Sequence, residues 1–138
     1  MIVVDEYLAV RVLGGDWPDD LPDEEIGLPA TRHWRLLQRV HAPGMGQLSR
    51  LLAALSGPDL AVVRWPHPEV LQGIGQRPLL DEAAAIAARY GGGLLIAETL
   101  AAGLNHGSQL WFGNPANVGR LMNAAAEDMG IAVHVTAV

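Results

Sequence analysis

The chain has 138 residues, half of them hydrophobic, which is enough for one domain with a real core and too few for two ordinary domains. Cysteine is absent, which excludes disulfides and thiolate metal sites, and no apolar run reaches the roughly 18 residues of a membrane span. The net charge of −6 argues against tight non-specific binding to nucleic acid. Because the N-terminus also lacks the basic segment of a signal peptide, we expect a cytoplasmic protein.

The charges are distributed unevenly along the chain. Acidic residues crowd into residues 16–25, whereas residues 26–58 hold four arginines and no acid. Every basic residue is arginine, which suits bidentate recognition of phosphate or carboxylate groups, although genomic base composition can produce the same bias. The acidic segment is either a solvated loop or a docking surface for a basic partner.

The first predicted element is a strand over residues 2–4, a β-branched run typical of a strand buried on both faces of a parallel sheet. Asp5 stands where this strand should end, and residues 7–13 read as a helix that enters the core. A carboxylate at the end of a central parallel strand lies where open α/β sheets build their sites. The alternative is that Asp5 only caps the following helix.

A short strand over residues 26–30 and a helix over residues 31–40, with Thr31 as N-cap, are predicted next. The three-residue spacing of its apolar side chains predicts that one face packs on the core. That face comprises Trp34, Leu37 and Val40, and the arginines Arg32, Arg35 and Arg39 share another face.

The middle of the chain is predicted to hold a helix over residues 47–55, with leucines at amphipathic spacing, and a strand over residues 60–65. Residues 69–75 read as a weak helix or a loop. The turn Gly44-Met-Gly46 resembles a phosphate-binding turn, but it follows a helix rather than a strand.

The C-terminal half carries the strongest pattern. Helices are predicted over residues 78–90 and 94–106, and a third helix begins at Asn114 and ends before Gly130. Strands are predicted over residues 109–113 and 131–135. Strands separated by helices imply βαβ units and a parallel sheet.

Three side chains with oxygen atoms are candidates for one site. Asp5 and Asn114 each follow a predicted strand, and Glu98 is the one charged residue of the apolar helix over residues 94–106. A carboxylate among Ala and Leu is costly to bury unless it is paired or bound to a metal. Carboxylates and water are the ligands that Mg²⁺ and Mn²⁺ prefer. For Glu98 the alternative is a solvent-facing position, and for Asn114 it is an ordinary helix cap.

The N-terminal strand ending in Asp5, the helical middle, the segment Gly107-Ser-Gln-Leu-Trp-Phe-Gly-Asn114 and the closing Gly-Ile-Ala-Val strand at residues 130–133 together resemble the PIN domain. That family includes the VapC-like toxin ribonucleases of toxin–antitoxin operons. The resemblance implies a single PIN-like domain over residues 1–138, with a three-layer α/β/α fold and a central, mainly parallel sheet of four or five strands. It also implies a Mg²⁺- or Mn²⁺-dependent endoribonuclease with an RNA substrate, a small antitoxin protein as partner, and a homodimer.

The resemblance assigns catalytic, metal-binding roles to three residues. Asp5 matches the family's first acid, and Asn114 matches the last, where the family accepts Asp or Asn. Glu98 is nearest to the third acid, although Ile96 occupies the usual place, and on a helix two residues turn a side chain by roughly 200°. A rival register uses Asp81 and Glu98 as the third and fourth acids and leaves Asn114 as a cap.

The main departure from the family concerns its second acid, near which this chain has Arg35. An arginine there repels a metal and can pair with Asp5 or Glu98 instead. Together with Arg32 and Arg39 it could equally contact an RNA phosphate.

Three hypotheses therefore remain open: an active PIN-like ribonuclease, a catalytically degenerate PIN-like module that binds RNA or protein, and a protein–protein component whose acidic loop docks a basic chain.

Overall fold

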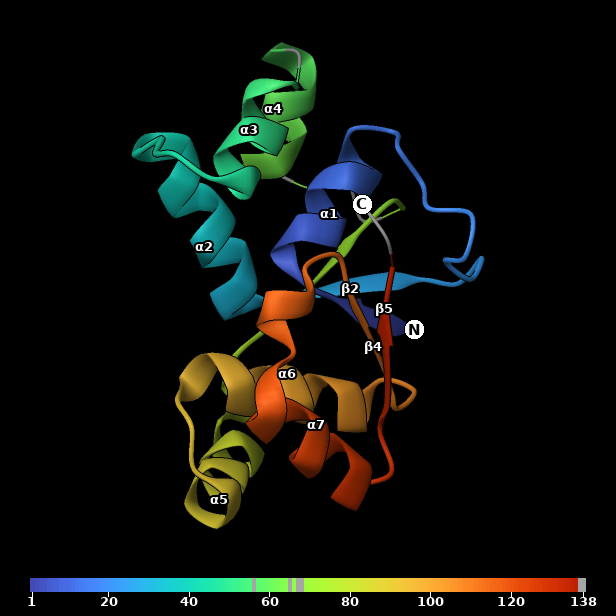
Figure 1. The fold of residues 1–138 in the computed structure, drawn as a ribbon, viewed down its shortest axis with the longest axis vertical. Coiled ribbons are helices and arrows are strands. Elements are labelled where there is room, and N and C mark those ends of the chain that lie inside the picture. The colour runs from blue at the N-terminus through green and yellow to red at the C-terminus, as the bar shows by residue number, and fades with distance from the viewer. Residues whose placement is uncertain (56, 65, 67–68, 137–138) are drawn as a thin grey trace.

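A five-stranded sheet lies at the centre of the chain (Figure 1). The computed structural model describes residues 1–55, 57–64, 66 and 69–136. The sheet order is β3-β2-β1-β4-β5, and every neighbouring pair of strands is parallel. The strands are β1 (Ile2–Val4), β2 (Ile26–Pro29), β3 (Gln72–Ile74), β4 (Gln109–Phe112) and β5 (Ala132–Val135).

Helices cover both faces of this sheet, which confirms the expected three-layer α/β/α fold. One layer holds α1 (Glu6–Leu13), α2 (Ala30–His41), α3 (Gln47–Ala53) and α4 (Gly57–Arg64). The other holds α5 (Leu80–Tyr90), α6 (Leu94–Asn105) and α7 (Gly119–Asp128), with the short 3₁₀ helices η1 (Arg77–Leu79) and η2 (Pro115–Asn117) before α5 and α7. Over the described residues, no helix is long and apolar enough to cross a membrane.

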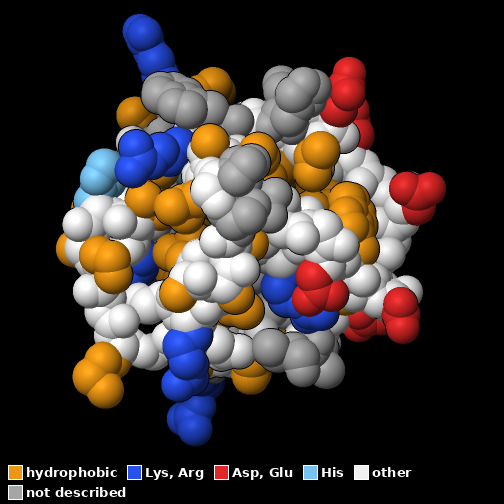
Figure 2. Space-filling view, turned by 90° about the horizontal axis from the view of Figure 1, so that it is seen from above, with side chains coloured by type: hydrophobic (Ala, Val, Ile, Leu, Met, Phe, Trp, Pro, Cys, Tyr) orange, Lys and Arg blue, Asp and Glu red, His pale blue; other side chains and the backbone are white. Residues whose placement is uncertain are grey.

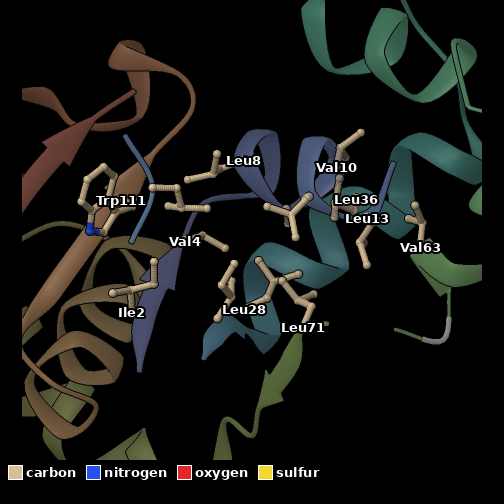
Figure 3. Close-up of a cluster of buried hydrophobic side chains, with 14 of the residues drawn as sticks. Ile2, Val4, Leu8, Val10, Leu13, Leu28, Leu36, Val63, Leu71 and Trp111 are labelled. Carbon is tan, nitrogen blue, oxygen red and sulfur yellow. The ribbon is translucent and has the colours of Figure 1, made fainter. Parts of the chain in front are cut away.

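The central strand β1 contributes to two separate cores. Ile2 and Val4 pack against the layer of α1 to α4, together with Leu28 of β2 and Leu36 of α2 (Figure 3). Val3 points the other way and packs against α5, α6 and α7. A strand buried on both faces needs apolar residues at every position, which explains the unbroken run that opens the chain.

Two elements differ from the sequence-based expectation in the middle of the chain. The strand predicted over residues 60–65 is wrong as far as Arg64, because residues 57–64 form α4, and Trp65 lies outside the described residues. Leu60 and Val63 instead pack on the core at helical spacing. The predicted weak helix or loop is also wrong, since Gln72–Ile74 form β3 and pair with β2. A three-residue strand with one buried side chain has too little pattern to be detected.

Helix α2 is rotated relative to its predicted orientation. Arg32 and Leu36 are its buried residues, whereas Trp34 is 58% exposed. Leu37 and Val40 are half-buried. Thr31 is not the N-cap, because that position belongs to Pro29, which makes no side-chain cap. The helix turns a charged residue inwards, so polar groups must receive it there.

The connections of the sheet reverse direction between β1 and β4. From β1 the chain adds β2 and β3 on one side, then crosses to add β4 and β5 on the other. Open α/β sheets bind ligands outside the carboxyl ends of the strands at such a switch point. Asp5 follows β1 and Gly113 follows β4, so both lie at this place.

Gly113 allows the end of β4 to approach the start of α1. A Cβ atom at Gly113 would lie 2.8 Å from the Leu8 nitrogen and 3.1 Å from the Tyr7 Cβ. We predict that Gly113→Ala lowers the free energy of unfolding by about 1–3 kcal/mol in urea denaturation. The reason is that the added Cβ would meet the backbone of α1, which cannot move aside as the end of a flexible side chain can. Gly73→Ala is the control, since a Cβ there meets nothing within 4 Å. Equal stability of the two variants would contradict this close approach.

Candidate functional site

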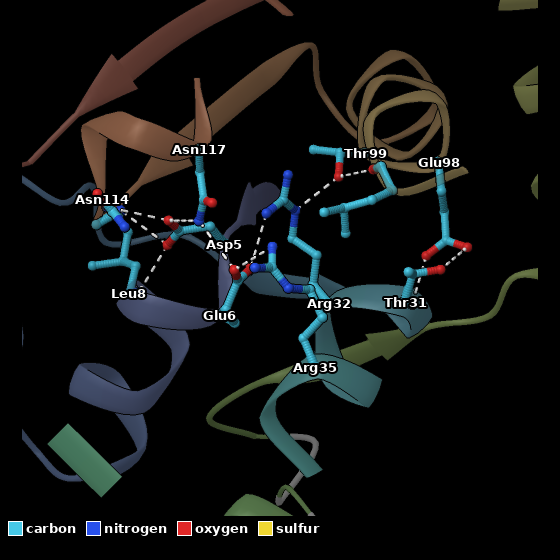
Figure 4. A network of polar contacts seen from close by, with 12 residues as sticks. Asp5, Glu6, Leu8, Thr31, Arg32, Arg35, Glu98, Thr99, Asn114 and Asn117 are labelled. Carbon is cyan, nitrogen blue, oxygen red and sulfur yellow. Dashed lines mark hydrogen bonds and ion pairs between the residues drawn. The ribbon is translucent and has the colours of Figure 1, made fainter. Parts of the chain in front are cut away.

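Asp5 is the centre of the polar residues at the switch point (Figure 4). Its carboxylate is 1% exposed and caps α1 by accepting the Leu8 N–H at 2.9 Å. It also accepts the backbone N–H groups of Gly113 at 2.9 Å and Asn114 at 3.2 Å, and the side-chain amide of Asn117 at 3.0 Å. A carboxylate offers about four acceptor positions, so these donors take them all.

The surroundings of Asp5 act on its ionisation in opposite directions. Burial of the carboxylate raises its pKa, and the neighbouring charge of Glu6 raises it further. The hydrogen bonds from Gly113, Leu8 and Asn117 lower it. The balance is a pKa above the ordinary value of 3.8.

Glu6 is a second fully buried carboxylate beside Asp5. Its Oε2 accepts from Arg32 Nη1 at 2.9 Å, and its Oε1 accepts from Arg35 Nη1 at 3.0 Å. Asn117 donates to both acids, since its side-chain amide lies 3.0 Å from Glu6 Oε1 as well. Glu6 and Asn117 are not among the residues predicted from the sequence. Two adjacent acids after a buried strand are the signal that could have indicated Glu6.

Arg32 connects α2 to the opposite layer of helices. Its guanidinium is buried, donates from Nε to Thr99 Oγ1 at 2.8 Å, and lies 5.5 Å from the centre of the Phe112 ring. With only 1% of its side chain exposed, Arg32 cannot reach an RNA phosphate at the surface. Arg35 keeps 35% of its side chain exposed, and Arg39 is exposed, so these two remain available to a ligand.

Glu98 is buried, but it lies apart from Asp5. Its carboxylate accepts the Thr31 N–H at 2.7 Å, the Thr31 hydroxyl at 2.9 Å and the Gln76 amide at 2.6 Å. A carboxylate at the start of α2 stabilises the positive end of the helix dipole. Figure 4 shows Arg32 and Arg35 between Glu98 and Asp5, so the two acids lie on opposite sides of the arginines.

Asn114 reaches Asp5 only through its backbone. Its side-chain oxygen accepts the Ala116 N–H at 3.0 Å and so caps η2. Asp81, which belongs to the rival register, is exposed in the first turn of α5. The structure therefore brings Asp5 and Asn114 side by side, and it does not bring Glu98 or Asp81 to them.

The donor set at this place does not fit Mg²⁺ or Mn²⁺ in this arrangement. The acceptor positions of Asp5 are taken by N–H groups, and Glu6 is held by two guanidiniums. Within residues 1–55, 57–64, 66 and 69–136, no group of three or more His, Cys, Asp or Glu side chains could hold a metal ion.

The buried ion pair between Arg32 and Glu6 gives a stability prediction. Arg32→Met should lower the free energy of unfolding by about 3 kcal/mol, because Glu6 loses one of its two cations while it stays buried. The double variant Glu6→Gln/Arg32→Met should recover part of that loss, since neither buried charge remains. Arg120→Met, at an exposed position, is the control. A double variant no more stable than the sum of its single changes would argue against direct coupling.

The raised pKa of Asp5 gives a pH prediction. Between pH 3.8 and the raised pKa the folded chain holds a proton that the unfolded chain has lost. The contribution of this group to the free energy of unfolding therefore falls as pH rises through that window. Carbon-13 NMR of the carboxyl groups should find the Asp5 pKa above 3.8, and lower in Glu6→Gln, where a neighbouring negative charge is gone. An Asp5 pKa at or below 3.8 in the unaltered chain would refute this assignment.

Comparison with known proteins adds no family assignment. No protein-family model matches the chain, and no curated protein matches it. What this chain does must therefore be inferred from the contacts of its own residues.

Proposed function

We propose that this chain is a catalytically degenerate, PIN-like module that binds RNA without cleaving it. The single observation that carries the proposal is the pairing of Glu6 with both Arg32 and Arg35 beside the saturated carboxylate of Asp5. These contacts occupy the side-chain oxygens that a nuclease of this kind would need for a metal.

The charges at the switch point argue against metal-dependent cleavage. A divalent ion is held by a surplus of negative charge, which then lets it activate water and stabilise the phosphate. Here both guanidiniums, Arg32 and Arg35, pair with Glu6, and Asp5 is held by N–H groups, so the formal charges of these four side chains sum to zero. The metal-dependent toxin ribonuclease, with Mg²⁺ or Mn²⁺, stays a prediction from the resemblance, and the contacts of Asp5 and Glu6 do not support it. The antitoxin partner and the homodimer also stay predictions from the resemblance.

The choice of RNA follows from the remaining arginines of α2. Arg35 and Arg39 lie one turn apart in the stretch of residues 26–58, which holds no acid. On the face that Figure 2 shows, most acidic side chains lie along one edge and most arginines lie away from it, so the negative charge is unevenly distributed over that face. Guanidiniums bind phosphate oxygens bidentately, and that chemistry suits a nucleic acid strand.

The proposal predicts RNA binding that needs no metal. In a filter-binding assay with EDTA, the full chain should retain a mixed pool of single-stranded RNA. In separate experiments without EDTA, Mg²⁺ and Mn²⁺ should show no binding to the chain by calorimetry and should not support cleavage of the RNA. Arg39→Ala should weaken binding and reduce the slope of log affinity against log salt by about 0.7, the value for one lost phosphate contact to a single strand. Arg120→Ala on α7 should leave both quantities unchanged.

Two results would overturn the proposal. Failure to bind any RNA would remove the function itself. Metal-dependent cleavage that disappears in Asp5→Asn would instead establish the nuclease.

A further inference from the structure

A small polar cavity lies beside Arg35, the partly exposed residue of the polar group around Asp5 and Glu6. It has a volume of about 140 Å³ and is lined by Tyr7 of α1, by Arg35, Gln38 and Arg39 of α2, and by residues 45–49. None of the lining residues is acidic. Two cations, two side-chain amides and two hydroxyl groups therefore border one space, and no acidic residue lines it.

Arg35 enters this cavity already positioned by another contact. Its Nη1 donates to the buried Glu6 at 3.0 Å, which restrains the side chain, while 35% of the side chain stays exposed. The remaining nitrogens of the guanidinium are additional donors. A guanidinium fixed in advance loses less conformational entropy when a ligand binds.

Arg39 brings the second cation to the cavity. No ion pair joins it to a carboxylate among the residues that the structure describes. Its Nη1 lies over Gly44, where a Cβ atom would come within 2.9 Å. The Gly44-Met-Gly46 turn therefore admits the guanidinium, although it is not the strand-to-helix loop that usually binds phosphate.

The size and donors of the cavity suit one phosphate group. At about 30 Å³ per water molecule it has room for roughly five waters, a number of heavy atoms that matches a phosphorus with its oxygens. Ser49 Oγ accepts the Gly44 N–H at 3.2 Å, so its own hydrogen remains free to donate. Guanidinium, amide and hydroxyl donors are those that recognise phosphate oxygens.

We propose that this cavity binds the terminal phosphate monoester of an RNA strand, an inference that rests on the proposed function. A monoester carries about −1.5 to −2 charge at neutral pH, against the single charge of an internal phosphodiester, so it gains more from the cation of Arg39, which no described carboxylate pairs, and from the remaining donors of Arg35. End recognition also fits a chain whose net charge of −6 disfavours long contacts with the backbone.

The test compares short RNAs of one sequence that carry a 5′-phosphate, a 3′-phosphate or hydroxyls at both ends. Fluorescence anisotropy with the full chain should show about tenfold or greater preference for one phosphorylated form, the range of a charge-assisted contact. Arg39→Ala should remove this preference. Gly44→Ala, which displaces Arg39 Nη1 but keeps its charge, should reduce it. Arg120→Ala is the matched control that should keep it, and inorganic phosphate should compete with the preferred RNA.

The outcomes separate this inference from the proposed function. Equal affinity for all three RNAs would overturn recognition of the strand end and leave RNA binding in place. Binding of inorganic phosphate that is lost in Arg39→Ala, without any RNA binding, would overturn the assignment to RNA. A preference that survives both Arg39→Ala and Gly44→Ala would place the end-binding site elsewhere and refute this cavity.

Discussion

The burial of two adjacent carboxylates at the end of the central strand is the constraint on which the rest of the structure depends. Asp5 and Glu6 lose their hydration when the strand and α1 enter the core, so the chain must supply hydrogen-bond donors to both. The donors come from different elements: the loop after β4 serves Asp5, and α2 serves Glu6 through two arginines. Satisfying these acids therefore ties the start of α1 to both neighbours of the central strand.

The same requirement explains why a place suited to catalysis carries so little free charge. Glu6 draws Arg32 inwards, and Arg32 then takes Thr99 as a further partner in the opposite layer. Glu98 meets its own need at the start of α2 with Thr31 and is not drawn to the switch point. Among the described residues, every buried side-chain nitrogen or oxygen has a hydrogen-bond partner close to it in space. The residues that remain available to a ligand are the partly exposed Arg35 and the exposed Arg39.

Much of the architecture was predictable from local pattern, and the site was predictable only in part. In the helices α5, α6 and α7 and in the strand β1, the spacing of the apolar residues predicts which side chains are buried. Asp5 follows from the same logic, because the end of a buried strand is identifiable without knowing its partners. Glu98 is identifiable as the one charged residue of an apolar helix, but its burial and direction are not, since its partner Thr31 lies 67 residues away in the sequence.

The sequence by itself determined an α/β chain with a parallel sheet, because strand and helix periodicities are local properties of the side chains. Only the tertiary structure decided that α2 turns Arg32 inwards and Trp34 outwards, and that residues 57–64 form a helix. The physical reason is that a buried charge lies where its counter-charge lies. For Arg32 that is Glu6, 26 residues away in the sequence, and no periodicity within α2 encodes it.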